Sequence, residues 1–216
     1  MAGSAVGGWV PVSGARGAGA GLGTCGSGGA GARVARGRRL ATGGLASGVT
    51  EAALTGEDRC MMRRCIGLAE RARGQTHPNP MVGCVLVHRG KILGEGFHPK
   101  AGEPHAEIFA LRDAQHRGNG WEVPGCTAYV SLEPCNHHGR TGPCSVALCD
   151  AKVGRVVVGM VDPNPLVNAG GIARLVDAGI TVDLMDGEEA DLCRHLNADF
   201  IARITAQTAT DAGGGA

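Results

Sequence analysis

The first fifty residues limit where this chain can fold. Residues 1–50 contain no Asp or Glu, five Arg, and a background dominated by Gly and Ala. Gly loses the most backbone entropy on folding and Ala buries little apolar area, so such a segment cannot build a hydrophobic core. We therefore expect residues 1–54 to be a disordered leader and residues 55–204 to form one domain.

The composition of the leader indicates a targeting signal. Arg-rich, acid-free N-terminal segments are typical of organelle transit peptides, and no long apolar stretch follows that would indicate secretion or a membrane span. We expect a transit peptide, with a low-complexity tail that carries no address as the alternative. Ser is sparse, so composition alone leaves plastid and mitochondrion both open.

The charge of the remaining chain points to a small-molecule partner. Taking the five Arg of residues 1–50 from the formal net charge of +1 leaves −4 on residues 51–216. A mildly acidic domain with one Tyr lacks the basic stripe and stacking platforms of nucleic-acid binding, so we expect neither a nucleic-acid nor a membrane partner. Nine Cys, scattered without a loop-rich disulfide framework, indicate a reducing compartment.

From Thr55 onward, helix-like and strand-like segments alternate. Thr55-Gly-Glu-Asp58 has the form of a capping box, and helical spacing follows to about residue 73. Two β-rich runs flank Arg89-Gly90, which predicts an antiparallel hairpin. The alternation favours an α/β layer sandwich, with residues 205–216 as a disordered tail. Further helices are expected over residues 105–116, 145–151, 171–178 and 188–204, and further strands over residues 127–132, 155–160 and 180–184.

One histidine, two cysteines and one glutamate carry the predicted chemistry. His105-Ala-Glu107 opens an expected helix, and Pro134-Cys135 follows an expected buried strand. One imidazole and two thiolates, with Cys144 as the third ligand, suit Zn²⁺ and leave its fourth tetrahedral position open, as in catalytic sites. Glu107 then remains as an unligated carboxylate that can move protons. His-x-Glu with Pro-Cys-x-x-Cys is the signature of zinc nucleobase deaminases, but here eight residues separate the cysteines instead of two.

Each half of this pattern has an ordinary explanation when it stands alone. A lone His-x-Glu is common, and Cys in an α/β protein is usually a small buried hydrophobe. The two halves lie where a helix is expected to begin and a strand to end, and this context favours the zinc site. The other cysteines of the domain are expected to pack or to lie on the surface: Cys60, Cys65, Cys84, Cys126, Cys149 and Cys193.

Four motifs together resemble the riboflavin-pathway pyrimidine deaminases, over about residues 58–203. They are His77-Pro-Asn-Pro80, Gly102-Glu-Pro-His-Ala-Glu107, the run from Leu132-Glu-Pro-Cys135 to Cys144, and Asp162-Pro-Asn-Pro165. This family, the diaminohydroxyphosphoribosylaminopyrimidine deaminases, belongs to the cytidine deaminase superfamily. The resemblance implies a three-layer α/β/α sandwich around a mixed sheet of about five strands. It also implies deamination of 2,5-diamino-6-(5-phosphoribosylamino)pyrimidin-4(3H)-one to 5-amino-6-(5-phosphoribosylamino)uracil and ammonia.

The resemblance also implies roles for individual residues. His105, Cys135 and Cys144 would hold zinc, a zinc-bound hydroxide would be the nucleophile, and Glu107 would shuttle protons. Turn formation or a solvated surface charge is the alternative for several of the implied substrate contacts. A guanidinium between the two cysteines suits a ribose phosphate. The substrate contacts implied are Asn79, His98, His137, Arg140, Asp162 and Asn164.

Two departures from the family pattern affect the expected phosphate contacts. Gly142 stands where members usually have Pro, and Asn168-Ala-Gly-Gly171 stands where many bacterial members carry a cation. Bacterial members usually continue into a reductase domain. We expect here a separate reductase that acts next, as in plants and algae, and this arrangement indicates a plastid. The habit of the family implies a homo-oligomer, a dimer or higher.

Two other functions remain as alternatives. A zinc deaminase acting on a free base, a nucleoside or tRNA would share the chemistry, but the long Cys-to-Cys spacing and the acidic charge argue against it. A non-catalytic, zinc-bound partner of a reductase would share the fold, but it would have no need for the unligated Glu107.

Overall fold

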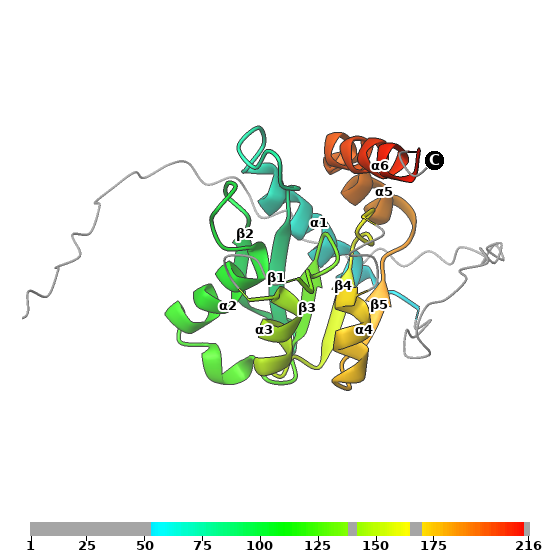
Figure 1. The fold of residues 1–216 in the computed structure, drawn as a ribbon. Coiled ribbons are helices and arrows are strands. Elements are labelled where there is room, and N and C mark those ends of the chain that lie inside the picture. The colour runs from blue at the N-terminus through cyan, green and yellow to red at the C-terminus, as the bar shows by residue number, and fades with distance from the viewer. Residues whose placement is uncertain (1–52, 138–141, 165–169, 214–216) are drawn as a thin grey trace, which may run out of the picture. The chain divides into compact units, whose positions relative to one another are not determined.

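The computed structural model of the protein describes residues 53–137, 142–164 and 170–213. A five-stranded sheet in the order β2-β1-β3-β4-β5 forms its centre (Figure 1). β1 pairs antiparallel with β2 and β3, whereas β3, β4 and β5 run parallel. The predicted mixed sheet and hairpin are therefore confirmed. The strands are β1 (Gly83–His88), β2 (Lys91–Phe97), β3 (Thr127–Val130), β4 (Arg155–Val158) and β5 (Thr181–Leu184).

Helices cover both faces of the sheet, as expected for an α/β/α sandwich. In Figure 1, α2, α3 and α4 lie on one face, and α1 and α5 lie on the other. No helix among the described residues combines the length and the apolarity needed to cross a bilayer. The helices are α1 (Gly56–Glu70), α2 (Ala106–His116), the 3-10 turn η1 (Gly120–Glu122), α3 (Cys144–Asp150), α4 (Gly170–Asp177), α5 (Gly187–Leu196) and α6 (Ala198–Gly213).

Glycines in β1 and β2 allow helices to lie directly on the sheet. A Cβ on Gly83 of β1 would lie 2.0 Å from the carbonyl oxygen of Cys65 in α1, and one on Gly94 of β2 would lie 2.3 Å from that of Ala110 in α2. Any larger residue would push these helices away from the strands. The apolar strands of the sheet centre are buried between the two helical layers, as is typical of parallel strands covered on both sides.

The predicted capping box begins α1 and also joins α1 to the sheet. The Thr55 hydroxyl accepts from the Asp58 backbone N–H at 3.1 Å, and the Asp58 carboxylate accepts from the Thr55 N–H at 2.8 Å. The same carboxylate accepts from the Tyr129 hydroxyl at 2.9 Å and from the Arg155 guanidinium at 2.6 Å. A local helix signal is thus also a tertiary tie to β3 and β4.

Two predictions about the C-terminal region were wrong. One helix over residues 188–204 and a disordered tail from residue 205 were expected, but α5 ends at Leu196 and α6 runs to Gly213. The break falls at Asn197, whose side chain accepts from the Met81 N–H at 2.8 Å and donates to the Met81 carbonyl at 3.0 Å. Beyond residue 204 the helix continues because each added residue extends an existing helix, and the Thr208 hydroxyl donates to the Ile204 carbonyl within it.

Candidate active site

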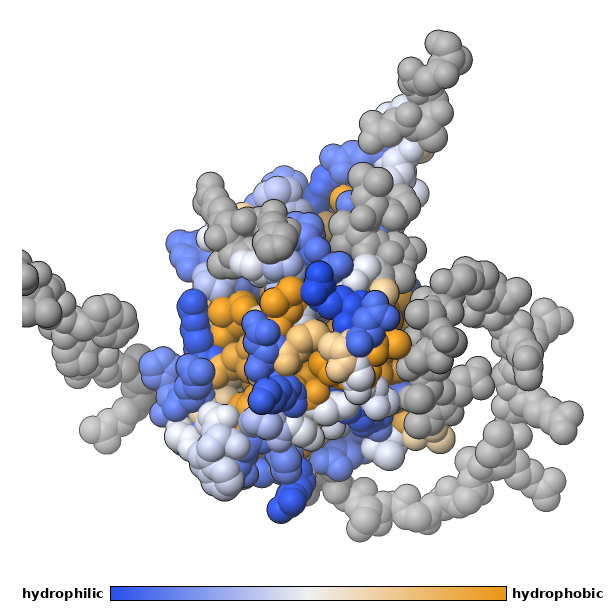
Figure 2. Space-filling model, turned by 60° about the horizontal axis from the view of Figure 1, so that its bottom comes forward, coloured by the Kyte–Doolittle hydropathy of each residue, from blue (hydrophilic) through white to orange (hydrophobic). Residues whose placement is uncertain are grey.

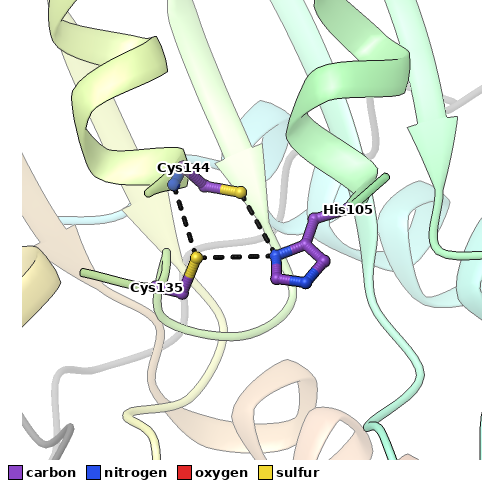
Figure 3. Close-up of side chains that lie close together, drawn as sticks. All are labelled: His105, Cys135 and Cys144. Atoms are coloured by element: carbon purple, nitrogen blue, oxygen red, sulfur yellow. Dashed lines mark hydrogen bonds between the residues drawn. The ribbon is translucent and has the colours of Figure 1, made fainter. Parts of the chain in front are cut away.

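Three side chains from separate elements meet beside the ends of two strands. His105 is the N-cap of α2, Cys135 follows β3 in a loop, and Cys144 is the first residue of α3. Figure 3 shows the two sulfur atoms facing the same nitrogen of the His105 ring. The predicted ligand set is therefore brought together, although 39 positions separate its first and last members.

The spacing of the three donor atoms fits a small tetrahedral cation. The Sγ atoms of Cys144 and Cys135 lie 3.3 Å and 3.5 Å from Nδ1 of His105, and all three donor atoms lie within 4.8 Å of one another. Zinc with ligand distances of about 2.05 Å to nitrogen and about 2.3 Å to sulfur would separate these atoms by about 3.6 Å. Two thiolates and one imidazole are also donors that zinc prefers.

Hydrogen bonds favour the thiolate form of Cys135. The hydrogen bond from the Cys144 thiol is the largest cause that lowers the pKa of Cys135, to about 4, and His105 lowers it further. The backbone N–H of Cys144 also donates to this sulfur at 3.3 Å. The shared proton raises the pKa of Cys144 in turn, and the bond with Cys135 raises the pKa of His105. A divalent cation at the centre would replace this shared proton, since metal binding releases protons from thiols.

Glu107 lies beside the triad as a buried carboxyl group. It is in the first turn of α2, is only 3% exposed, and is not one of the three clustered donors. Burial is the main cause that raises its pKa to about 7, and the negative charge of Cys135 adds to the effect. A carboxyl group with this pKa can both take and release a proton near neutral pH.

A cavity of about 220 Å³ opens beside this centre. It is lined by His105, Glu107 and Cys135, and also by five of the six residues expected to contact a substrate. The sixth, Arg140, lies outside the described residues. The structure thus places the described candidates around one space, while their individual roles stay predictions. The five are Asn79, His98, His137, Asp162 and Asn164.

Hydrogen bonds determine which ring nitrogen of His98 carries the proton. Its Nδ1 lies 3.0 Å from the carbonyl oxygen of Pro104, which can only accept, so Nδ1 donates. Its Nε2 lies 3.1 Å from Nδ2 of Asn79 and accepts from that amide. Burial lowers the pKa of His98, which agrees with a neutral ring. The side chain of Asn79 thereby has a tertiary partner, in addition to the turn in which its backbone N–H donates to Thr76.

Six cavity residues were not among the site residues predicted from the sequence: Pro80, Val82, Leu132, Glu133, Phe200 and Ile204. Glu133 stands in the Leu-Glu-Pro-Cys motif, so a signal for it was present. Phe200 and Ile204 lie about one helical turn apart on α6. This spacing predicts that both side chains lie on the same face of the helix, but it does not predict what that face contacts. Asn197 and Arg203 anchor α6 to the segment before β1, with Arg203 donating to the Pro78 carbonyl.

This sheet, the His-Cys-Cys cluster and the adjacent buried glutamate define a domain of the cytidine deaminase type. Residues 55–160 match the family model for the cytidine and deoxycytidylate deaminase zinc-binding region. The chain belongs to this deaminase superfamily and, within it, to the riboflavin biosynthesis group whose members are named RibD and PYRD.

Comparisons with individual proteins support this placement. The chain is 58% identical over 168 residues to the chloroplastic riboflavin biosynthesis protein PYRD of Zea mays, covering 77% of this chain and 41% of that protein. It matches the solved RibD structure of Acinetobacter baumannii with 50% identity and a TM-score of 0.64, covering 68% of this chain and 40% of that one.

A third relative is named for two activities. A Thermotoga maritima diaminohydroxyphosphoribosylaminopyrimidine deaminase/5-amino-6-(5-phosphoribosylamino)uracil reductase matches with 38% identity and a TM-score of 0.65, covering 69% of this chain and 42% of that one. The chain thus spans about two fifths of the length of these relatives.

Proposed function

We propose that this protein deaminates 2,5-diamino-6-(5-phosphoribosylamino)pyrimidin-4(3H)-one to 5-amino-6-(5-phosphoribosylamino)uracil in riboflavin biosynthesis. One observation carries the proposal: a His-Cys-Cys cluster and a buried carboxyl group share a cavity with five polar residues expected to contact substrate. The names of the relatives supply the pathway and the substrate class.

We propose zinc as the cofactor, held by His105, Cys135 and Cys144. The donor set, the distances to Nδ1 of His105 and the lowered pKa of Cys135 all support it. When bound, zinc lowers the pKa of a water ligand from about 15.7 toward roughly 7 and so supplies a hydroxide nucleophile near neutral pH.

Glu107 would move the protons of the reaction. It takes a proton from the attacking water and passes it to the departing nitrogen. The oxygen of the water bonds to C2 and becomes the carbonyl oxygen of the product, and the second proton of the water passes to ring nitrogen N1. The bond between C2 and the amino nitrogen breaks, and that nitrogen leaves as ammonia. Burial raises the pKa of this carboxyl group, and a carboxyl group that titrates nearer the working pH can act first as a base and then as an acid. Its burial keeps bulk water from competing for these protons.

The remaining lining residues would orient the substrate. Neutral His98 and Asn79 form a hydrogen-bonded pair in the cavity wall, and Asp162 and Asn164 also line the cavity. These amide and carboxylate groups suit the hydroxyl and amino groups of a ribosylated pyrimidine, while Phe200 offers an apolar surface to the ring. His137 and the predicted Arg140 would contact the phosphate.

Ammonia release by the purified full-length chain tests the proposal. The phosphorylated diaminopyrimidinone and cytidine are supplied in parallel, and ammonia and bound zinc are measured. Release from the phosphorylated compound alone is the expected result. Release from cytidine alone would overturn the substrate assignment, and release from neither by zinc-loaded protein would favour a non-catalytic role.

We further propose a plastid location, with a reductase acting next in the pathway. The Zea mays relative is named chloroplastic, and the Thermotoga maritima relative is named for both activities. The Arg-rich, acid-free composition of residues 1–50 agrees with a transit peptide. A fluorescent protein carrying residues 1–54 should enter chloroplasts, whereas one in which the five Arg are changed to Gln should stay outside.

Self-association is also part of the proposal. Figure 2 shows an apolar area, bordered by hydrophilic residues, on one face of the molecule. Exposed apolar areas rimmed by polar residues can mark interaction surfaces. Sedimentation of the purified chain should therefore give at least the mass of a dimer, and the mass of a monomer at micromolar concentration would contradict this.

A further inference from the structure

Glu133 joins three parts of the chain around one buried carboxylate. It directly precedes the Pro134-Cys135 pair after β3, and it is 4% exposed. Its Oε2 accepts from the Asp162 backbone N–H at 3.2 Å, and its Oε1 accepts from the N–H groups of Gly171 at 3.1 Å and Ile172 at 3.4 Å. The loop after β4 and the first turn of α4 are therefore both bound to the segment that carries Cys135.

The first turn of α4 has little freedom to move away from this carboxylate. A Cβ on Gly171 would lie 1.8 Å from the carbonyl oxygen of Pro134, so the helix backbone packs directly against the loop before Cys135. The N–H groups at a helix N-terminus lack partners within the helix and favour negative charge. Glu133 supplies that charge from the neighbouring loop.

The hydrogen bonds accepted by Glu133 reach the cavity through Asp162. While the Asp162 N–H donates to Glu133, its side chain accepts from the Asn164 N–H at 2.9 Å, and both residues line the cavity. Glu133 lies inside the region that matches the family model, whereas Asp162 and Asn164 follow the end of that match at residue 160. The carboxylate thus connects the region with the zinc-type cluster to a segment beyond the matched region.

We propose that Glu133 is a positioning residue for substrate binding. Its carboxylate holds Asp162 and Asn164 at the cavity wall and so sets the affinity for the substrate, without touching the reacting atoms. This inference rests on the proposed deamination for its kinetic consequence. The hydrogen bonds on which it depends can be tested separately.

Glu133→Gln in the full-length chain is the direct test. The amide oxygen of Gln can still accept from Gly171 and Ile172, but its NH₂ group cannot accept from the Asp162 N–H. Hydrogen exchange should therefore become faster in residues 160–164 and stay unchanged in α3. We expect KM to rise about tenfold, the equivalent of roughly 1.4 kcal/mol, with kcat changed by less than about threefold and with zinc content unchanged.

Glu189→Gln is the matched control. Glu189 is also buried, at 2% exposed, but it forms ion pairs with Arg59 and Arg63 on α1 and does not line the cavity. This control should lower thermal stability and leave KM unchanged. Asp162→Ala is the second variant, which serves if Glu133→Gln does not fold. It removes the Asp162 side chain, which the Glu133 carboxylate is proposed to hold at the cavity wall, and should raise KM at least as much as Glu133→Gln does.

Unchanged exchange in residues 160–164, an unchanged KM in Glu133→Gln, or an equal rise of KM in the Glu189 control would each overturn the inference. Loss of zinc from Glu133→Gln would also overturn it, because Glu133 would then support the metal ligands instead of the substrate. Failure of the wild-type chain to release ammonia would refute only the proposed function. The hydrogen-exchange result would still test the hydrogen bond between Glu133 and the Asp162 N–H.

Discussion

Asp58→Asn should weaken the fold while leaving the active site intact. The Asp58 carboxylate is 2% exposed and binds groups from three elements: Thr55 before α1, Tyr129 in β3 and Arg155 in β4. Asn keeps the size of the side chain but removes its charge and one of its two acceptor atoms. The change therefore tests the carboxylate and not the space that it fills.

The shifted pKa of Asp58 provides the magnitude. Burial alone would raise this pKa, but hydrogen bonds from Arg155, Thr55 and Tyr129 outweigh burial and lower it from 3.8 to about 2. At about 1.36 kcal/mol per pKa unit, this difference corresponds to roughly 2 kcal/mol of stability. Because the folded-state pKa is lowered, the contribution is fully present above pH 3.8 and is lost as the pH falls through 2.

Urea unfolding of metal-free protein at several pH values measures this effect. At pH 7 the variant should be less stable than wild type by about 2 kcal/mol, and the gap should close between about pH 4 and pH 2. Asp191→Asn is the control, since Asp191 forms an exposed pair with Arg194 and should change stability by less than about 0.5 kcal/mol. A gap that stays constant down to pH 2 would refute the reasoning.

Four further predictions concern the site and the sheet. Glu107→Gln should bind zinc normally yet lower kcat by at least about 10³-fold, because acid–base catalysis is lost. Metal analysis measures the bound zinc and ammonia release measures kcat. Full activity of the variant would contradict the proton-transfer role of Glu107. Cys135→Ser should lose both zinc and turnover, whereas a zinc-replete variant would exclude Cys135 as a ligand. Phe200→Ala should raise KM several-fold with little change in kcat, since an apolar wall is lost; steady-state kinetics decide, with an unchanged KM as the contrary result. Gly83→Ala should destabilise the fold by at least about 2 kcal/mol in thermal unfolding, because its Cβ would overlap the Cys65 carbonyl, and an unchanged Tm would contradict this.

Local signals predicted most of the fold. The capping box at Thr55, the turn at Arg89-Gly90 and the alternation of apolar runs each depend on residues close in sequence, and the structure has α1, the hairpin and all five strands. The metal-type cluster was also predictable. Its residue types and their places at expected element ends define a donor set before any distance is known.

Long-range contacts account for the errors and the omissions. Asn197 ends α5 because its amide side chain binds Met81, which is 116 positions away. Continuation of α6 to Gly213 could not be inferred from small polar residues, since composition does not show that a helix already exists for them to extend. Phe200 entered the cavity wall only because α6 is anchored beside the segment before β1.

The sequence by itself determined which elements form and which side chains can bind a metal, because helix caps, turns and donor chemistry are properties of residue types and short spacings. Only the tertiary structure decided how those side chains act. The neutral state of His98 requires the Pro104 carbonyl and the Asn79 amide at two sides of one ring, and the role of Glu133 requires three backbone N–H groups around one buried carboxylate. Such states depend on which atoms surround a group and exclude water from it, and packing alone brings atoms from distant positions together.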